Sequence, residues 1–434
     1  MDYIDSQLIY VFRQLWVCMD QTRKEFFTLD DFDFMGKTVL LRVDLNSPIH
    51  PLTSEIMSDT RFKSHLPTIE KLRNAKVVIM AHQSRPGKSD FTSLFQHSRR
   101  LERLLGRRVK FVDSLYGNSA LDAIKRMESG DILMLENTRF YSEDVVLDPG
   151  ERETIENSNL VKNLSSVCDY FVNDAFPAIH RAQTSLTGFT HSLPNVAGLL
   201  IQKETGALNS FLKGDRSRNL AILAGAKIED SITVADSFLK KDIVGKIVVG
   251  GVVANAFLWA SGKKIGKKNE EFIKHNNRNY EKYLKVCREL LDKFPEQIIM
   301  PVDYVLNPSR LRIDLDENIP DDQIVADIGL NSIARFSEEI RKAESLFING
   351  PMGMYEIEEY SSGTFEILKE VAASGAMKIA GGGHTISAIE ALGVENRIDH
   401  MSTGGGALIS YLSGEPMPVL ESLRESKRYF EKVI

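Results

Sequence analysis

Short apolar runs alternate with amphipathic segments along most of the chain. Each run is typical of a buried strand, and a glycine-rich, polar or charged exit follows it. The predicted strands are Thr38–Val43, Lys76–Ala81, Asp131–Leu135, Asp169–Val172, Leu220–Leu223, Lys246–Val249, Ser345–Ile348 and Met377–Ala380. Helical spacing occurs between many of them, for example at Ile386, Ile389 and Leu392 before Gly393. This alternation predicts an α/β fold with parallel sheets covered by helices on both faces.

The rhythm of strands is interrupted once, by the segment Leu199–Lys213, which has the pattern of a connecting helix. Because 434 residues exceed what one ordinary core accommodates, we expect two domains, one on each side of it. The two halves share this organisation without obvious sequence identity.

Composition limits the functional classes. An apolar content of 43%, a charged content of 26% and a net charge of −6 are those of a globular protein with no general attraction to nucleic acid or acidic membranes. The three cysteines lie far apart, which disfavours a disulfide framework or zinc site and fits a reducing compartment. No apolar run is long enough to span a bilayer. We therefore expect a cytoplasmic protein with neither nucleic-acid nor membrane partners.

Basic and polar residues follow the strands of the first half. They are Asp44, Asn46, His82, Arg85, Arg139 and Arg181, with Arg61 at a predicted helix start. Ligands of open parallel sheets bind beyond the carboxyl ends of the strands, where these side chains should converge. Guanidinium groups match the oxygens of phosphate and carboxylate, so a small anionic substrate is predicted. The alternative is a network neutralised locally by Asp44 and Glu136.

Glycines follow the strands of the second half, together with one lysine, Lys227. In the stretch Lys378–Thr385, a strand end, three glycines and a helix start form a typical phosphate site, although a tight turn is an equal alternative. This composition suits a nucleotide, but neither a Walker loop nor a dinucleotide fingerprint is present, which disfavours a dehydrogenase. An anion-binding half and a nucleotide-binding half suggest phosphoryl transfer across a cleft.

Nine motifs, in order, resemble the signature segments of the phosphoglycerate kinase family. They are RVDLNSP, DTRFKSHLPTI, HQSRPG, LENTRF, VNDAFPAIHRA, LAGAKIEDS, NGPMGMYE, GGGHT and STGGGA, and GAKIEDS and GGGHT are similar to the archaeal branch. The resemblance extends from about Lys37 to Leu423 and is more specific than any single motif.

The resemblance implies two similar doubly wound domains with a cleft between them, and a reversible transfer between ATP and 3-phosphoglycerate in glycolysis and gluconeogenesis. Residues 1–30 would be an extension of unknown role, 31–198 the phosphoglycerate domain, 199–213 a hinge helix, 214–412 the nucleotide domain, and 413–434 a segment returning to the first domain. Mg²⁺ would be carried with ATP or ADP, and the protein would be a monomer or homodimer.

The resemblance also implies site roles. Arg61, Lys227, Gly382 and Gly383 would be catalytic. Phosphoglycerate would be held by Asp44, Asn46, Arg61, His82, Arg85, Arg139 and Arg181. The nucleotide would be held by Gly225, Ala226, Lys227, Gly250, Asn349, Gly350, Pro351, Glu356, Gly382, Gly383, His384 and Thr385.

Three residues depart from the pattern of many family members. Ser231 replaces a second lysine, His384 replaces an aspartate that contacts the metal, and Gln183 replaces a histidine. A neutral imidazole is a poor ligand for Mg²⁺, so we expect no protein metal ligand and a metal held by phosphate oxygens and water. The alternative is a catalytically weak, nucleotide-binding regulatory protein on the same fold, which the retention of Arg61 and Lys227 disfavours.

Overall fold

The chain forms two compact units. The structure is a computed structural model that describes residues 25–147 and 152–432. The first unit comprises the chain up to Gly206 together with the segment from Glu415 onward, and the second unit comprises Ala207–Gly414. The boundary at Gly206 lies inside α8 (Leu199–Lys213), the helix expected from the sequence. Most of the expected extension, residues 1–24, lies outside the described residues.

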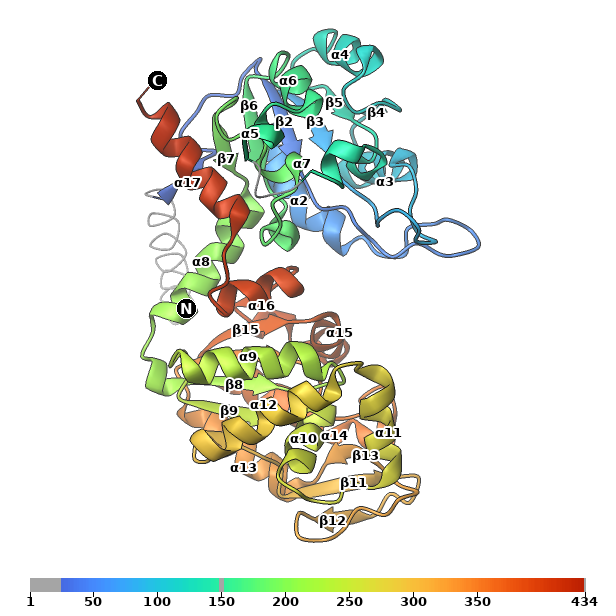
Figure 1. The fold of residues 1–434 in the computed structure, drawn as a ribbon, viewed down its shortest axis with the longest axis vertical. Coiled ribbons are helices and arrows are strands. Elements are labelled where there is room, and N and C mark those ends of the chain that lie inside the picture. The colour runs from blue at the N-terminus through green and yellow to red at the C-terminus, as the bar shows by residue number, and fades with distance from the viewer. Residues whose placement is uncertain (1–24, 148–151, 433–434) are drawn as a thin grey trace, which may run out of the picture. The chain divides into compact units, whose positions relative to one another are not determined.

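A seven-stranded parallel sheet forms the centre of the first unit (Figure 1). Its strands, in spatial order, are β1 (Phe27–Thr28), β7 (Asn195–Ala197), β6 (Tyr170–Asn173), β2 (Thr38–Arg42), β3 (Lys76–Met80), β5 (Ile132–Met134) and β4 (Val109–Phe111). Alternate side chains of β2 enter different cores, because Val39 and Leu41 pack on one face and Leu40 on the other. Burial on both faces explains why the strands are continuously apolar.

Helices cover both faces of this sheet. They are α2 (Thr60–Lys71), α3 (Phe95–Leu105), α4 (Asn118–Lys125), α5 (Arg152–Glu156), α6 (Asn159–Ser165), α7 (Thr184–Thr187) and α17 (Pro418–Phe430). α2 contains Pro67 without ending there. Asp59 occupies the N-cap position of α2, but its side chain forms no cap and instead accepts from Arg100 at 2.7 Å.

The last helix, α17, is part of the first unit and lies beside β7 (Figure 1). Buried serines attach it there. Ser426 Oγ accepts from the backbone N–H of Asn195 at 3.0 Å, and Ser422 Oγ lies 2.6 Å from Thr190 Oγ1. The strand nearest the C-terminal helix is therefore held by residues more than two hundred positions later in the sequence.

The second unit contains a six-stranded parallel sheet and a smaller antiparallel one. The large sheet has the spatial order β10 (Ile298–Ile299), β9 (Lys246–Val249), β8 (Asn219–Leu223), β14 (Ser345–Asn349), β15 (Met377–Gly381), β16 (His400–Met401). The small sheet is β12 (Arg312–Asp314), β11 (Asp303–Asn307), β13 (Ile324–Ile328), and the sequence pattern did not predict it.

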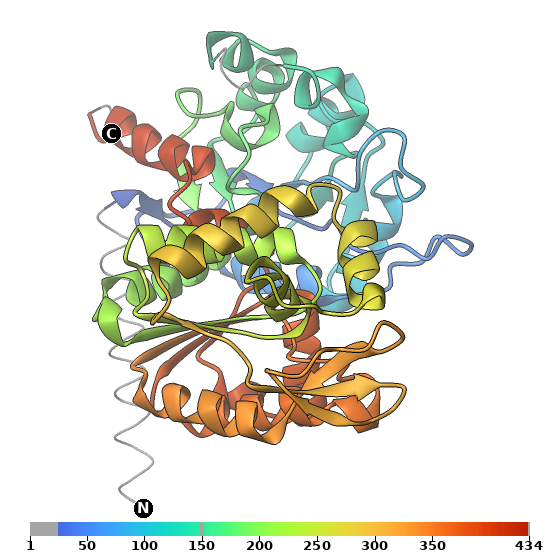
Figure 2. The ribbon, with the colours of Figure 1, turned by 60° about the horizontal axis from the view of Figure 1, so that its bottom comes forward.

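Helices cover the large sheet from both sides: in Figure 2, α12 lies on one side of its strands and α13 on the other. The helices are α9 (Ile228–Lys240), α10 (Gly251–Ala260), α11 (Lys267–Asn276), α12 (Tyr280–Lys293), α13 (Leu330–Lys342), α14 (Ser362–Ala373), α15 (Gly383–Leu392) and α16 (Gly406–Leu412). Each unit is thus a parallel sheet between helical layers, and the predicted α/β class is confirmed.

Candidate active site

The polar residues predicted in the first half follow neighbouring strands and come together at the carboxyl edge of the sheet. Asp44 follows β2, His82 follows β3, Arg139 follows β5 and Arg181 follows β6. Asp44, Arg139 and Arg181 all act electrostatically on His82, and Arg85 acts on Arg139. The order of strands switches between β2 and β6: β3, β5 and β4 lie on one side of β2, whereas β6, β7 and β1 lie on the other. Ligands of such sheets bind at this switch point.

Asp44 forms an ion pair with Arg61 from the first turn of α2. Its other carboxylate oxygen accepts from the backbone N–H of Asn46 at 2.9 Å. Burial would raise the pKa of Asp44, but the charge of Arg61 and smaller contributions from its neighbours outweigh burial and lower the pKa to about 2. Asp44 is therefore ionised at neutral pH and aligns Arg61. Asn46 is fixed in turn, since its Oδ1 accepts from Ser84 N–H at 2.9 Å.

His82 is buried beside Arg42, a site residue that the sequence analysis did not identify. His82 Nδ1 lies 3.0 Å from Arg42 Nη2. Burial and then the charge of Arg42 lower the pKa of His82 well below its usual value, so the imidazole is neutral and can accept from one side and donate from the other. Arg42 is only 1% exposed, and burial lowers its pKa to about 10, which leaves it charged. The sequence did contain a signal for Arg42, because it is a charged residue at the end of the otherwise apolar strand β2.

Positive charge exceeds negative charge in this cluster. Arg42, Arg61, Arg85, Arg139 and Arg181 face two carboxylates, Asp44 and Asp144. Asp144, 3% exposed, was also missed, because its strandless segment gave no indication of where it lies. Burial and then Arg181 lower the pKa of Arg139. One of the five arginines, Arg42, is fully buried, and gathering this much positive charge is costly without a bound anion, so the cluster is suited to one.

Glu136 does not neutralise the arginines, contrary to the alternative considered from sequence. Its carboxylate accepts from Ser93 Oγ at 2.6 Å and from Leu94 N–H at 2.9 Å, at the start of α3. The residue contributes to the structure of that helix start.

Arg85 and Arg181 are the exposed members of the cluster. Arg181 Nε donates to His180 Nε2 at 3.3 Å, and Arg139 Nη1 donates to Ser84 O at 2.6 Å. The cluster thus combines fixed, buried groups with arginines that reach solvent, as a site open to a soluble anion requires.

Backbone turns at the carboxyl ends of β8, β9, β14 and β15 form the second site. Gly225 N–H donates to Pro351 O at 2.9 Å, and Ala224 N–H donates to Asn349 O at 2.8 Å. Gly350 has φ +94°, and a Cβ there would lie 2.1 Å from Ala224 O. Gly250 is the N-cap of α10 and is buried. The turns pack too closely for side chains, which explains their glycines.

The N-terminus of α15 is free of side-chain capping. Gly382 has φ +83°, and a Cβ would lie 2.5 Å from Asn349 Oδ1, whereas a Cβ at Gly383 would meet nothing within 4 Å. Thr385 Oγ1 accepts from Gly350 N–H at 2.7 Å and joins this helix to the loop after β14. Open space above uncapped helical N–H groups, with their positive dipole, suits phosphate oxygens.

His384 and Glu356 lie side by side at this helix start. His384 Nδ1 is 3.7 Å from Glu356 Oε1, and both side chains are exposed, at 74% and 58%. Ala226 and Lys227 are exposed at the N-terminus of α9. Ser231, one turn further, is 1% exposed, and its Oγ approaches Ala224 O at 3.4 Å. Because Ser231 is uncharged and buried, Lys227 supplies the exposed positive charge at this helix start.

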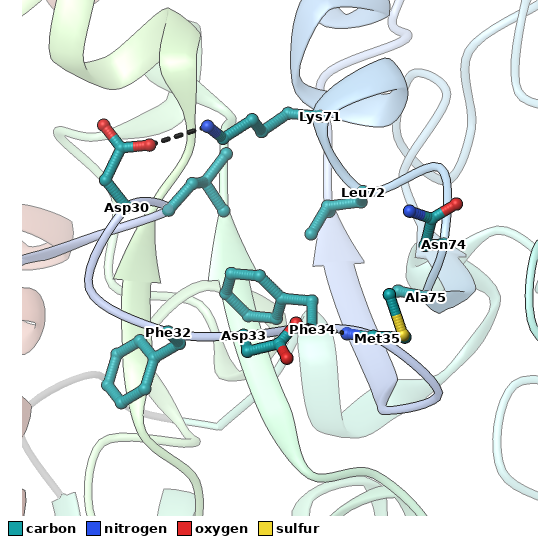
Figure 3. A pocket seen from close by; sticks show the side chains of 10 residues that line it. Asp30, Phe32, Asp33, Phe34, Met35, Lys71, Leu72, Asn74 and Ala75 are labelled. Atoms are coloured by element: carbon teal, nitrogen blue, oxygen red, sulfur yellow. Dashed lines mark hydrogen bonds and ion pairs between the residues drawn. The ribbon is translucent and has the colours of Figure 1, made fainter.

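A further pocket of the first unit, lined by segments 29–35 and 71–75, contains none of the predicted site residues (Figure 3). Met35 and Ala75 precede β2 and β3, so the pocket lies at the amino edge of the sheet, opposite the arginines. The ion pair between Lys71 Nζ and Asp30 Oδ1, 2.7 Å long, crosses it.

Within residues 25–147 and 152–432, no group of three or more His, Cys, Asp or Glu side chains is placed to hold a metal ion. None of the described helices is long and apolar enough to cross a membrane.

Comparisons with known proteins agree on one family. The family model described as phosphoglycerate kinase matches residues 29–415. A phosphoglycerate kinase of Thermoplasma acidophilum is 59% identical, covering 94% of this chain and 99% of the relative. One of Methanothermus fervidus is 44% identical, covering 94% and 100%. The crystal structure of phosphoglycerate kinase from Pyrococcus horikoshii matches with a TM-score of 0.84 at 42% identity, covering 93% and 100%.

Proposed function

The chain belongs to the phosphoglycerate kinase family, and we infer that it catalyses reversible phosphoryl transfer between ATP and the carboxylate of 3-phosphoglycerate, giving ADP and 1,3-bisphosphoglycerate. The observation that carries this inference is the cluster of five arginines around Asp44, Asp144 and neutral His82. A substrate with a phosphate at one end and a carboxylate at the other matches such a cluster in charge and in hydrogen-bonding geometry.

We propose that the first unit holds 3-phosphoglycerate. The hydrogen-bonding groups for it are Asp44, Asn46, Arg61, His82, Arg85, Arg139 and Arg181, with Arg42 behind them. Arg42 is buried and contacts His82, so it orients that imidazole and adds charge. Asp44 accepts from substrate hydroxyl groups, which a carboxylate of low pKa does well at neutral pH.

We propose that the second unit holds the nucleotide. The backbone N–H groups of Gly382, Gly383 and His384 donate to phosphate oxygens at the start of α15. Thr385 holds the adjacent turn in place, because its Oγ1 accepts from Gly350 N–H. The glycine turns at Gly225, Ala226, Gly250, Asn349 and Pro351 leave room for the remaining nucleotide, and Glu356 accepts from ribose hydroxyl groups. Lys227 lies at the exposed start of α9, where it can reach the transferred group.

The chemistry is a direct displacement. A carboxylate oxygen of phosphoglycerate attacks the γ-phosphorus, the bond from that phosphorus to the β-phosphate oxygen breaks, and the electron pair leaves on ADP. Arg61 neutralises developing charge from the acceptor side, and Lys227 from the donor side. The two ligands belong to different units, so we propose that transfer occurs in a state of the protein in which both ligands meet.

We propose that Mg²⁺ arrives with ATP or ADP. The described residues include no side-chain cluster that would hold it without the nucleotide, and His384 offers nitrogen where Mg²⁺ prefers oxygen. The metal supplies charge neutralisation on the phosphates when bound. We also propose that the protein is cytoplasmic and acts as a monomer or homodimer.

A coupled assay tests the reaction. The protein is incubated with 3-phosphoglycerate, ATP and Mg²⁺, and 1,3-bisphosphoglycerate is consumed by an auxiliary dehydrogenase that oxidises NADH. Turnover at ordinary kinase rates, of order 1–100 s⁻¹, is expected. Nucleotide binding without turnover would favour the weak regulatory protein and overturn the proposal.

A further inference from the structure

One buried histidine, His65, joins the phosphoglycerate site to the start of α8. It lies on α2, four residues after Arg61, and is 0% exposed. Its Nε2 accepts from the backbone N–H of Asp44 at 3.0 Å, and its Nδ1 lies 2.7 Å from Oδ2 of Asp174, which is also fully buried. His65 therefore contacts the backbone of the residue whose carboxylate is paired with Arg61.

These partners select one form of the imidazole. Because Asp44 N–H donates to Nε2, that nitrogen carries the lone pair, and the ring proton is on Nδ1, where it donates to Asp174. The opposite tautomer would place an N–H against Asp44 N–H and leave Nδ1 without a donor. A doubly protonated ring could donate from Nε2 to Asp44 O, which also lies 3.1 Å away, but Asp44 N–H would then face a second donor and lose its acceptor.

Asp174 continues the connection to α8. Its Oδ1 accepts from the N–H of Leu200, in the first turn of α8, at 2.9 Å. The carboxylate is fixed against Gly198, where a Cβ would lie 2.0 Å from the same oxygen. One turn beyond His65, Thr68 Oγ1 accepts from the N–H of Leu199 at 2.9 Å. One face of α2 thus contacts both the substrate site and the first turn of α8.

We propose that His65 is a positioning residue of the phosphoglycerate site, which holds the Asp44 loop in place and couples its occupancy to the first turn of α8. This proposal rests on the proposed function. An anion bound at Arg61 changes the pairing of Asp44, and Asp44 passes the change to His65 and Asp174 through buried hydrogen bonds. The first turn of α8 therefore responds to phosphoglycerate through the bond between Asp174 and Leu200. The same helix continues across the boundary at Gly206 into the second unit.

Kinetics of variants test the positioning role. His65→Asn keeps a donor near Nδ1 and loses the acceptor for Asp44 N–H. Leaving a buried donor unsatisfied should raise the KM for 3-phosphoglycerate about tenfold, with the KM for ATP changed less than about twofold. His65→Gln, whose Oε1 reaches the Nε2 position, should restore much of the loss. Asp174→Asn should resemble His65→Asn, because an amide nitrogen there opposes the Nδ1–H donor.

Thr68→Val is the matched control, since it removes a bond from α2 to α8 without touching Asp44. It should lower stability but leave the KM for 3-phosphoglycerate within about twofold of wild type, because it leaves no group of the site unpaired. If Thr68→Val raises this KM as much as His65→Asn, or if His65→Asn has the wild-type KM, the positioning role is wrong.

Spectroscopy and hydrogen exchange test the tautomer and the coupling in the full-length protein. Long-range ¹H–¹⁵N correlation, with the His65 signals assigned by their loss in His65→Asn, should show a neutral ring protonated at Nδ1. Adding 3-phosphoglycerate should shift these signals and slow amide exchange around Leu200, whereas ADP alone should do neither. An imidazolium, an Nε2–H tautomer, or an exchange response that survives in His65→Asn overturns the inference. A wild-type protein without turnover would instead refute the proposed function.

Discussion

Asp44 forms an ion pair with Arg61, whereas Lys227 forms no ion pair with another described residue. Both are expected to gain contact with the transferring phosphoryl group only in the transition state, where such contacts accelerate the reaction. We predict that Arg61→Ala and Lys227→Ala each lower kcat at least about a hundredfold, a barrier increase of about 2.7 kcal/mol. Steady-state kinetics on folded variants provide the measurement.

The matched controls are exposed lysines on the same helices, Lys63 on α2 and Lys240 on α9. Their alanine variants should keep kcat within about twofold, because loss of an exposed charge or of a surface ion pair has little energetic effect. The double variant of Arg61 and Lys227 should be less impaired than the product of the two single effects, since both act on one transition state. Near-normal turnover of Arg61→Ala would remove this residue from the mechanism.

His384 provides a second test at the nucleotide site. If phosphate oxygens rather than protein side chains hold the metal, His384→Ala should leave the Mg²⁺ concentration for half-maximal rate almost unchanged and weaken ATP binding a few-fold. His384→Asp, which supplies an oxygen ligand, should lower the Mg²⁺ requirement. Titration of Mg²⁺ at fixed ATP measures both. A large rise for His384→Ala would show that the imidazole contributes to metal binding after all.

Site residues could be predicted from sequence where they lie in the loop that follows a strand. Asp44, His82, Arg139 and Arg181 meet because strand exits share an edge, which is a property of parallel sheets. Asp144 could not be placed in this way, because its position depends on contacts with distant segments, such as the bond from Ser185 N–H at 2.8 Å. The individual ligand roles remain predictions.

Asp327 connects β13 to α14 in the second unit and gives stability a pH dependence. It lies on β13, and its carboxylate accepts from Gly363 N–H, in α14, at 2.7 Å and from Ile328 N–H at 2.9 Å. Burial outweighs these bonds and raises its pKa from 3.8 to about 7. The folded state therefore holds a proton that the unfolded state releases between pH ~4 and ~7.

We predict that this residue makes unfolding easier as pH rises through that window, by at most about 1.4 kcal/mol per pH unit. Denaturant unfolding of wild type and Asp327→Asn at pH 5 and pH 8 measures this contribution. Between pH 5 and pH 8, the free energy of unfolding of wild type should fall relative to that of Asp327→Asn. A difference that is the same at both values would mean that Asp327 titrates normally.

Elements followed the sequence pattern closely where both faces are buried. β9 has the predicted bounds, and β2, β3, β14 and β15 differ from the predicted ends by one residue. The antiparallel sheet escaped prediction because its strands are not continuously apolar: β12 consists of Arg312, Ile313 and Asp314, none of them buried. Very short strands such as β1 and β16, each of two residues, carry no periodic signal.

For the chain as a whole, the family model begins only at residue 29, and none of the predicted site residues precedes Asp44. We predict that deleting residues 1–24 changes kcat and both KM values less than about twofold, since termini tolerate removal when they carry no site residue. Coupled assays on the full-length and shortened proteins measure this. A large loss of activity in a folded, shortened protein would assign the segment a function.

The attachment of α17 beside β7 also affects how the polypeptide is made. The first unit requires Pro418–Phe430, but the ribosome must first synthesise Ala207–Gly414, the whole of the second unit. At about 5–20 residues per second, this leaves the earlier segment without its final helix for roughly 10–40 s. During that interval β7 and β1 lack a covering that the finished protein provides. Nascent chains arrested before Pro418 should therefore be more sensitive to protease in the first unit than chains released after Phe430.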